Sequence, residues 1–427
     1  MILTGKRAAY ITLGCKLNFS ETSTIRRSLE EAGTISVNEK EGADIFVINT
    51  CSVTEVAERK ARQLIRKIIK HNPEAYIVVV GCYAQLGAQE LMKIEGVKLV
   101  LGADEKFRVA HYLEHYEELQ KQEPHSCNVF KLSNFDLACS FGDRTRSFLK
   151  IQDGCDYFCT YCTIPFARGK SRSASISEVV NTAKEISHKG IREIILTGVN
   201  TGDFGRDSDE NFLQLIQSLD QVEEIDRFRI SSIEPNLLTD EIISFIASSK
   251  RFMPHFHIPL QSGSNQVLQL MKRRYNRELF ADKIEKINTI CPDTFIGVDI
   301  IAGMRGEKPE DFEDARDFVE KLNVSQLHVF PYSERQGTKA LEIEHIVSQE
   351  EKHRRVEVLL RISETKLHDF YKRFEGQTRE VLFEENKVKG RIYGFTDNYI
   401  RVALPYDDNL ANRIIPVELK PEILVME

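Results

Sequence analysis

Residues 147–162 read SFLKIQDGCDYFCTYC, an apolar, β-rich segment that leads into a loop with the spacing C-x3-C-x2-C. The cysteines are Cys155, Cys159 and Cys162, and Gly154 gives the start of the loop conformational freedom. Thiolates bind iron–sulfur clusters and zinc alike. A structural zinc site needs a fourth ligand, whereas the next histidine, His188, falls within a predicted helix. We therefore favour a 4Fe–4S cluster with one open iron over zinc.

The strand–helix alternation that begins at this segment continues to residue 333. The predicted strands are 147–152, 193–198, 227–233, 256–260, 294–303 and 325–333, with helices between them. Six βα units predict a partial (β/α)6 TIM-type barrel, and we assign residues 147–374 to this domain. The cysteine loop follows the first strand, so it lies on the C-terminal face, where barrels place their active sites.

Residues 1–122 alternate between strands and helices in the same way. Strands are predicted at 8–14, 44–50, 76–81 and 97–101, and helices at 18–32, 55–71, 85–95 and 105–122. The strands are almost continuously apolar, which is typical of a parallel sheet covered on both faces. We predict a doubly wound parallel sheet, so the chain is an α/β multidomain protein.

Three more cysteines, Cys15, Cys51 and Cys82, each follow one of these N-terminal strands. The carboxyl ends of parallel strands share one edge of the sheet, so the three thiols can converge there. Any single cysteine could instead be a small buried hydrophobe. Because all three occupy the same topological position, we predict a second three-thiolate site.

The remaining segments have a different character. Residues 123–146 show no period and are predicted to be a linker, and residues 348–375 form a long charged helix. Residues 375–427 contain short strands broken by Gly, Asp and Asn, which predicts a small all-β barrel. This domain is either an RNA-binding appendage or a packing cap, and its acidic residues outnumber its basic ones, which weakens the first alternative.

Composition limits the classes of function. The chain has 427 residues, 41% hydrophobic and 29% charged, with a formal net charge of −7 and 9 cysteines. No run reaches the roughly 18 uncharged apolar residues of a membrane span, and the N-terminus shows no secretion signal. We expect a cytoplasmic protein that does not associate with a membrane. Because the net charge is negative, any contact with nucleic acid must depend on local basic patches.

The motifs together resemble the methylthiotransferase family of the radical S-adenosylmethionine (SAM) superfamily over essentially the whole chain. They are TLGCKLN (12–18), NTCSVT (49–54), GCYAQ (81–85), DRTR (143–146), KIQDGCDYFCTYCTIPFARG (150–169), HIPLQSGS (257–264), MKRR (271–274) and GVDIIAG (297–303). The C-terminal domain resembles a TRAM domain. The sequence around Cys15 and Cys51 most resembles that of the family branch that acts on threonylcarbamoyladenosine in tRNA.

The resemblance implies a chemistry. Cys155, Cys159 and Cys162 would hold the radical-SAM 4Fe–4S cluster, and Cys15, Cys51 and Cys82 an auxiliary 4Fe–4S cluster. SAM cleavage would give a radical that abstracts hydrogen, so that a methylthio group can be added at carbon 2 of threonylcarbamoyladenosine, at tRNA position 37. A second SAM would supply the methyl group. An electron donor such as flavodoxin or ferredoxin is implied, and we expect a monomer.

The resemblance also implies SAM contacts at Gly198, Asn200, Asp299 and Gly303. A plain βα turn is an alternative for the first two, and an arginine partner within the barrel is an alternative for Asp299. The family usually has Pro and Thr in the turn that here reads GMRGEK (303–308), so Arg305 and Lys308 depart from the pattern. They could serve RNA or belong to a solvated turn, and His255 and His257 are expected to be structural.

Three basic patches are candidates for tRNA phosphates, with a solvated surface as the alternative. They are Arg59, Lys60, Arg62, Arg66, Lys67 and Lys70; Arg168, Lys170 and Arg172; and Lys272, Arg273, Arg274 and Arg277. Other functions stay open at this point. The same clusters could act on isopentenyladenosine in tRNA or on a ribosomal-protein aspartate, or the chain could be an iron–sulfur scaffold without a SAM pocket.

Overall fold

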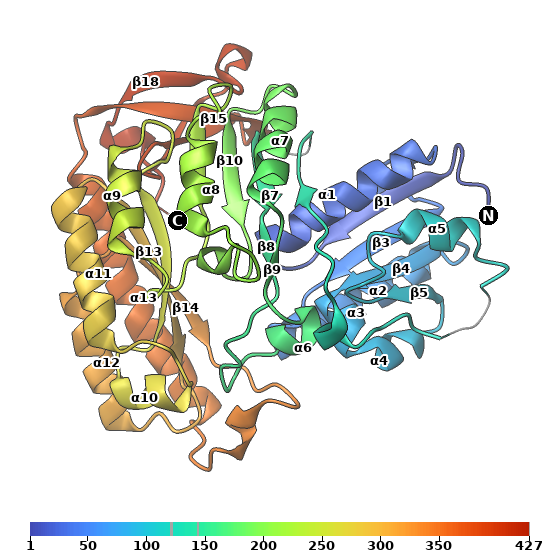
Figure 1. The fold of residues 1–427 in the computed structure, drawn as a ribbon, viewed down its shortest axis with the longest axis horizontal. Helices are drawn as coiled ribbons and strands as arrows, with labels where there is room; N and C mark the ends of the chain where they lie inside the picture. Colours follow the sequence, from blue (N-terminus) through green and yellow to red (C-terminus); the bar gives the residue numbers. More distant parts are fainter. Residues whose placement is uncertain (120–122, 143–144, 427) are drawn as a thin grey trace.

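The computed structural model describes residues 1–119, 123–142 and 145–426. Figure 1 shows two α/β bodies side by side, with the C-terminal strands packed against the body formed by the middle of the chain. Residues 120–122, at the end of one predicted helix, and residues 143–144 of the DRTR motif lie outside the described residues.

The N-terminal body is a parallel sheet of five strands in the order β2-β1-β3-β4-β5. Its strands are β1 (Arg7–Thr12), β2 (Ile35–Ser36), β3 (Ile45–Thr50), β4 (Tyr76–Gly81) and β5 (Val97–Leu101). Its helices are α1 (Lys16–Glu31), α2 (Glu55–His71), α3 (Cys82–Leu86), α4 (Ala88–Met92) and α5 (Val109–Glu114). Separate apolar cores cover the two faces, so the predicted parallel sheet is confirmed.

Two helix predictions in this body are wrong. The helix expected over 85–95 is two short helices, α3 and α4, that meet at Gly87. A Cβ at Gly87 would lie 2.2 Å from the Tyr83 ring, so the glycine lets the chain pack there. The helix expected over 105–122 is only α5 within the described residues. The two-residue edge strand β2 was too short to give a sequence signal.

The middle body contains the six predicted strands, arranged as two parallel groups. One sheet has the order β11-β10-β7-β6, with β6 antiparallel, and the other has the order β12-β13-β14. An isolated bridge between Phe228 and Phe252 and a backbone hydrogen bond from the Ile233 N–H to the His257 carbonyl at 3.1 Å link the two groups. The strands are β6 (Ala138–Cys139), β7 (Arg146–Lys150), β10 (Glu193–Thr197), β11 (Arg227–Ile230), β12 (His255–Gln261), β13 (Phe295–Ala302) and β14 (Gln326–Pro331).

Helices cover the outside of these strands (Figure 1). The covering helices are α7 (Ile176–Ser187), α8 (Phe212–Leu219), α9 (Asp240–Ser248), α10 (Asn265–Leu270), α11 (Arg277–Ile290), α12 (Pro309–Lys321) and α13 (Gln349–Lys372). A capping box at Ser175 and Glu178 begins α7, as the sequence predicts. The segment after β7 adds a small hairpin and one helix: β8 (Gln152–Asp153), β9 (Arg172–Ser173) and α6 (Ile164–Arg168).

The C-terminal segment is an antiparallel sheet in the order β17-β16-β15-β18. Its strands are β15 (Thr378–Val388), β16 (Arg391–Thr396), β17 (Arg401–Pro405) and β18 (Ile414–Glu418). Its apolar core includes Phe295 from the start of β13, so the sheet packs on the N-terminal end of this strand of the middle body. The cysteine loop lies at the opposite, C-terminal ends. Among the described helices, none has the length and apolarity to cross a membrane.

Candidate functional site

The loops that follow β1, β3 and β4 bring Cys15, Cys51 and Cys82 together. Glycine permits the close approach, because a Cβ at Gly14 would lie 2.9 Å from the Cβ of Cys51. A Cβ at Gly81 would likewise lie 2.3 Å from Asn49 Oδ1. Burial raises the pKa of the Cys51 thiol to about 12, and the neighbouring Cys82 and Cys15 contribute to the increase. The three thiols therefore lie within electrostatic range of one another.

A buried arginine connects two of these cysteines. Arg168 Nε donates to Cys82 Sγ at 3.2 Å, and its Nη2 donates to Asn18 Oδ1 at 3.1 Å. The Cys15 thiol donates to the same Oδ1 at 3.1 Å. Arg168 belongs to α6, which follows Cys162, so the loop of the second cysteine set supplies a hydrogen bond to the first set.

Cys155, Cys159 and Cys162 form the second set. Gly154 has φ +75°, and a Cβ there would lie 1.9 Å from the carbonyl oxygen of Lys170, so the tight start of this loop requires glycine. Burial raises the pKa of both Cys155 and Cys162 to about 12, and the neighbouring cysteines add to it. Arg273 donates from Nη1 to Cys159 Sγ at 3.1 Å and pairs with Glu234.

The two sets share one design feature. The first has one thiol after each of three parallel strands and the second has all three in the loop after β7, but each has one buried arginine that donates to one sulfur. Among the described residues, no group of three His, Cys, Asp or Glu side chains has the arrangement of a metal-ion site. A cubane offers each thiolate a different iron, so its ligands are farther apart than those of one ion. The donor chemistry fits such a cluster better than a single zinc.

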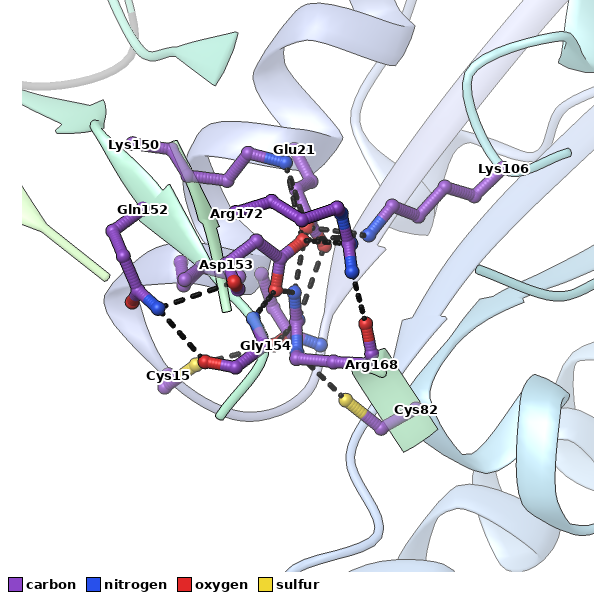
Figure 2. Close-up of polar contacts among 12 residues, drawn as sticks. Cys15, Glu21, Cys82, Lys106, Lys150, Gln152, Asp153, Gly154, Arg168 and Arg172 are labelled. Carbon is purple, nitrogen blue, oxygen red and sulfur yellow. Dashed lines mark hydrogen bonds and ion pairs between the residues drawn. The ribbon is translucent and has the colours of Figure 1, made fainter. Parts of the chain in front are cut away.

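An ion-pair network joins the two bodies behind the cysteines (Figure 2). The Glu21 carboxylate, from α1, lies 2.6 Å from Lys106 Nζ, 2.8 Å from Arg168 Nη1 and 3.5 Å from Lys150 Nζ. Asp153 lies 2.9 Å from Arg168 Nη1. Each of these five side chains is at most 5% exposed. Burial alone would raise the pKa of Glu21, but the three cations hold it at about 2.

The network corrects two assignments from the sequence. Arg168 and Arg273 were candidates for tRNA phosphates, but each side chain is only 3% exposed and contacts a cysteine sulfur. Sequence patterns could not distinguish a basic patch on the surface from arginines that neutralise buried carboxylates and thiols. The first patch, on α2, is different, because Arg59, Lys60, Arg66, Lys67 and Lys70 are exposed.

A cavity of about 280 Å³ lies between the two cysteine loops. Val53 and Thr54, after Cys51, form one wall, and Tyr161, within the second cysteine loop, lies on the other. The ends of β12, β13 and β14 complete it with Gln261, Asp299, Ile301 and residues 330–333. Gln261 has φ +66° at an irregularity in the pairing of β12, a strained backbone of the kind found at functional sites.

The predicted SAM-binding residues are not equivalent in the structure. Asn200 is 3% exposed, and its Nδ2 has no hydrogen-bond partner among the described residues. Its backbone N–H donates to Gln152 Oε1 at 2.9 Å, and Gln152 in turn donates to the carbonyl of Gly154 at 2.8 Å. A Cβ at Gly198 would meet the same Gln152. These two residues therefore lie beside the start of the second cysteine loop.

Asp299 and Gly303 have other contacts. Asp299 pairs with His257 Nε2 at 2.8 Å, so the arginine partner considered for it is wrong. The His257 ring stacks on His328, with centroids 5.0 Å apart. Gly303 has φ +77° and donates its N–H to Glu307 at 2.7 Å, and a Cβ there would meet Lys352 of α13. Arg305 forms an ion pair with Glu334 at 2.7 Å.

Comparison with known proteins agrees with this geometry. Residues 7–102 match the model of the uncharacterized protein family UPF0004, and residues 149–319 match the radical SAM superfamily. The threonylcarbamoyladenosine tRNA methylthiotransferase MtaB of Bacillus subtilis is 39% identical over 96% of this chain and 93% of its own. The tRNA-2-methylthio-N(6)-dimethylallyladenosine synthase of Syntrophus aciditrophicus is 30% identical over 90% and 85%.

Among solved structures, the radical SAM methyltransferase TsrM from Kitasatospora setae has a TM-score of 0.59 at 12% identity. The match covers 76% of this chain and 73% of that one. At this identity the likeness concerns the fold.

Proposed function

The chain belongs to the radical SAM family of tRNA methylthiotransferases, and on that premise we propose that it converts threonylcarbamoyladenosine at tRNA position 37 to its 2-methylthio derivative, at carbon 2. The observation that carries this proposal is the pair of three-thiol sets on either side of one cavity. A reaction that joins sulfur to an unactivated carbon needs both a radical source and a sulfur source, and the cavity adjoins a candidate for each.

Radical SAM chemistry requires a 4Fe–4S cluster and SAM. We assign that cluster to Cys155, Cys159 and Cys162, and a second 4Fe–4S cluster to Cys15, Cys51 and Cys82. When bound, the first supplies the electron that cleaves SAM and the second supplies sulfur. The protein holds both sites in register through Arg168 and restricts solvent there, since Cys51, Cys82 and Cys159 are each below 10% exposed.

Asn200 is the SAM contact that the geometry supports best, because its buried amide Nδ2 has no partner within the described chain. Gly198 adjoins it, and Asp299 lines the cavity between the loops. Gly303 remains a prediction from the family resemblance. Its N–H is already satisfied by Glu307, so a contact from this turn would use other atoms.

The finer architecture is part of the proposal. We assign residues 1–122 to the auxiliary-cluster domain, 123–146 to a linker, 147–374 to a partial (β/α)6 radical SAM barrel and 375–427 to a TRAM domain. The exposed basic residues of α2 begin beside the cavity wall at Thr54 and are the best candidates for tRNA phosphates. We further propose a cytoplasmic monomer that receives electrons from a flavodoxin or ferredoxin.

The test uses the full chain, reconstituted with iron and sulfide without oxygen. Wild type should hold about eight irons, and a Cys155/Cys159/Cys162→Ala variant about four. With SAM and a reductant, wild type should methylthiolate an anticodon stem-loop that carries threonylcarbamoyladenosine. Two further substrates test the alternatives: the same stem-loop carrying dimethylallyladenosine, and, in a separate assay, a ribosomal protein. If only an alternative substrate gave product, the assignment would be overturned. If the reconstituted enzyme did not cleave SAM, the chain would be an iron–sulfur scaffold.

A further inference from the structure

Three phenylalanine rings lie together on the surface beside the second cysteine set. Phe130, Phe158 and Phe166 are 39%, 44% and 41% exposed. Their ring centroids lie 6.0 to 6.1 Å apart, with Phe130 stacked on Phe158 and Phe166 edge-on to both. We call these three rings the aromatic patch. Single exposed apolar side chains are ordinary, but exposed apolar side chains that gather in one place mark interaction sites.

The aromatic patch is assembled from three segments of the chain. One ring comes from the short helix η2 (Val129–Lys131), one from the cysteine loop and one from α6. Gly169, which has φ +79°, brings the end of α6 against η2, because a Cβ there would lie 2.2 Å from the Val129 carbonyl oxygen. The close packing of the three segments therefore holds the rings in place at the surface.

Phe158 links the aromatic patch to the second cysteine set. It precedes Cys159 directly, and its φ of +49° is a strained conformation for a bulky residue. Because the ring is 44% exposed, burial in a core does not compensate for this strain. Such strain is typical of functional positions. The strained conformation here presents an aromatic ring to solvent, one residue away from a ligand of the proposed radical-SAM cluster.

Positive charge borders the aromatic patch. Lys131 adjoins Phe130, and Lys170 follows the glycine that packs against η2; both lysine side chains are exposed. The segments that contain or adjoin the patch and the cysteine loop carry no Asp or Glu; they are residues 124–135, 157–172 and 265–277. On a chain with a net charge of −7, this absence makes the surface locally basic.

A second pair of cations, Lys272 and Arg274, is exposed on the turn that follows α10. Arg274 packs on the cysteine loop, where its Nη2 donates to the Asp156 carbonyl at 2.7 Å and its guanidinium lies 4.0 Å from the centroid of the Tyr157 ring. The Asp156 carboxylate itself pairs with Arg206 at 3.3 Å. We call Lys131, Lys170, Lys272 and Arg274 the basic rim.

The aromatic patch lies outside the cavity in which the reaction is proposed to occur. Among the described residues that line this cavity, none belongs to the patch. The cysteine loop contributes Tyr161 to the cavity and Phe158 to the exposed surface, so it has an inner and an outer side. While SAM and the target base occupy the cavity, an electron has to reach the second cysteine set from elsewhere. The aromatic patch is exposed surface next to those cysteines.

We propose that the aromatic patch and the basic rim form the docking surface for an acidic electron-carrier protein of the flavodoxin or ferredoxin class. In each encounter the reduced carrier loses one electron and the cluster held by Cys155, Cys159 and Cys162 gains it, with no bond formed or broken. The rings supply the contact, and the basic rim attracts and orients an acidic partner. The inference rests on the proposed function and assigns its electron donor a place on the surface.

Two features favour a protein over tRNA, which is also acidic. The small size of the patch suits the limited interfaces of transient electron-transfer complexes. The candidate surface for tRNA, on α2, begins beside the cavity wall, whereas the aromatic patch does not line the cavity. Binding of tRNA to the patch is therefore the alternative that the test has to distinguish.

The test compares two reductants. Reduced flavodoxin is the protein probe, and dithionite is a small reductant that needs no docking surface. Flavodoxin affinity is measured by fluorescence anisotropy, with the reconstituted full chain and with the iron-free chain, and stem-loop affinity is measured in the same way. SAM cleavage is followed as 5′-deoxyadenosine. Each flavodoxin-driven rate is divided by the dithionite-driven rate of the same preparation, which corrects for differences in iron content.

Two variants remove the charge and the apolar contact separately: Lys131→Glu with Lys170→Glu, and Phe130→Ser. Each should weaken flavodoxin binding about tenfold or more and lower the ratio of the two rates by a similar factor. The dithionite-driven rate and the affinity for the anticodon stem-loop should stay at their wild-type values. Added salt should weaken flavodoxin binding to wild type more than to the lysine variant.

Matched controls change the same properties at other places. Lys93→Glu with Lys98→Glu reverses two exposed lysines at and near β5, and Ile35→Ser removes an apolar side chain that is 55% exposed on β2. Both controls should bind flavodoxin as wild type does and keep the wild-type ratio of rates.

Three results would overturn the inference. They are the absence of saturable flavodoxin binding to wild type, wild-type affinity and rate ratio in both test variants, and a loss of stem-loop affinity in the lysine variant with flavodoxin binding unchanged. The last result would assign the surface to tRNA. If wild type cleaved SAM but did not methylthiolate the stem-loop, the proposed function would be refuted, while the flavodoxin measurements would still decide the docking surface.

Discussion

Glu21 is the central carboxylate of the buried ion-pair network between the two bodies. Its carboxylate is fully buried and forms ion pairs with Lys106, Arg168 and Lys150. Lys106 belongs to the N-terminal body, and Arg168 and Lys150 belong to the middle body. A buried ion pair gives little net stability over an apolar contact, but removal of one partner leaves uncompensated charge behind. We therefore expect the network around Glu21 to add little net stability as a whole, whereas the loss of one of its members is costly.

Glu21→Gln should destabilise the protein by about 3–5 kcal/mol, because three buried cations lose their shared anion. The measurement is the urea midpoint of the reconstituted protein at pH 7. The matched control, Glu30→Gln, lies on the same helix, with Glu30 40% exposed and 3.7 Å from Arg26. It should change stability by no more than about 0.5 kcal/mol. Equal effects of the two variants would show that the network does not hold the bodies together.

The pH dependence of Glu21 has a definite sign. Its pKa is about 2 in the folded protein, below its ordinary 4.5, so its contribution is complete above pH 4.5 and is lost as the pH falls toward 2. Wild type should therefore lose its advantage over Glu21→Gln within this range.

His328 should give a second, separate acid sensitivity. Burial and the neighbouring His257 lower its pKa from 6.5 to about 4. Between pH 6.5 and pH 4 this histidine is protonated in the unfolded chain but neutral in the folded chain. The free energy of unfolding therefore decreases as the pH falls through this range, by up to about 3 kcal/mol. His328→Gln should reduce the difference between urea midpoints at pH 7 and pH 5. The exposed control His353→Gln should leave that difference unchanged, and a wild-type slope in His328→Gln would refute the assignment.

At the scale of elements, the loop between β7 and α6 depends on Gly154. Alanine there would have an unfavourable positive φ and a Cβ 1.9 Å from the Lys170 carbonyl oxygen, so the hairpin that begins the cysteine loop could not close. Gly154→Ala should therefore lose the radical-SAM cluster, with about four of about eight irons remaining. Gly190→Ala is the control, because φ there is +81° but nothing lies within 4 Å of the added Cβ.

Gly190→Ala should cost only about 1–2 kcal/mol and keep all the iron. Iron and acid-labile sulfide, measured after anaerobic reconstitution, distinguish the two variants. A full iron content in Gly154→Ala would show that the loop tolerates a different path.

Helix α1 shows where prediction from sequence reached its limit. Its approximate position and the place of Cys15 before it were predictable, because parallel strands end at one edge. Its buried face was not. Asn18, Ser20, Glu21, Thr22 and Ser23 are buried, although such residues usually face solvent. The missing apolar stripe at the start of α1 was the available signal, since a helix without one is either solvated or buried against polar groups.

The same limit applied to the arginines. Arg168 and Arg273 belong to sequence runs that resemble phosphate-binding patches, and only the tertiary structure shows that they contact cysteine sulfurs. The cysteine positions followed from topology, which a sequence reveals through its periodicity. The partners of a buried charge come from distant segments, as with Glu21 and Lys150, and no local pattern encodes them.

At the scale of the molecule, the C-terminal sheet packs closely against strands of the middle body. Arg229 donates to the carbonyls of Thr396 and Asp397 at 2.7 and 2.8 Å, and Arg227 donates to that of Glu380 at 2.9 Å. The apolar core of the sheet also includes residues of α13 and β13. These contacts support the packing cap, one of the two alternatives from the sequence, and do not bear on the RNA-binding appendage. The packing role can therefore be tested separately from RNA binding.

Truncation after residue 374 should make the protein aggregate, because it exposes Phe295 and Phe374 and leaves two buried arginines without their carbonyl acceptors. Size-exclusion chromatography and the urea midpoint measure this. Lys387→Glu with Lys389→Glu, exposed near the β15–β16 turn, changes the charge of the domain without altering its base. That variant should keep the wild-type midpoint, and any loss of tRNA affinity in it reports RNA contact. A monomeric truncated chain of wild-type stability would show that the domain is an appendage after all.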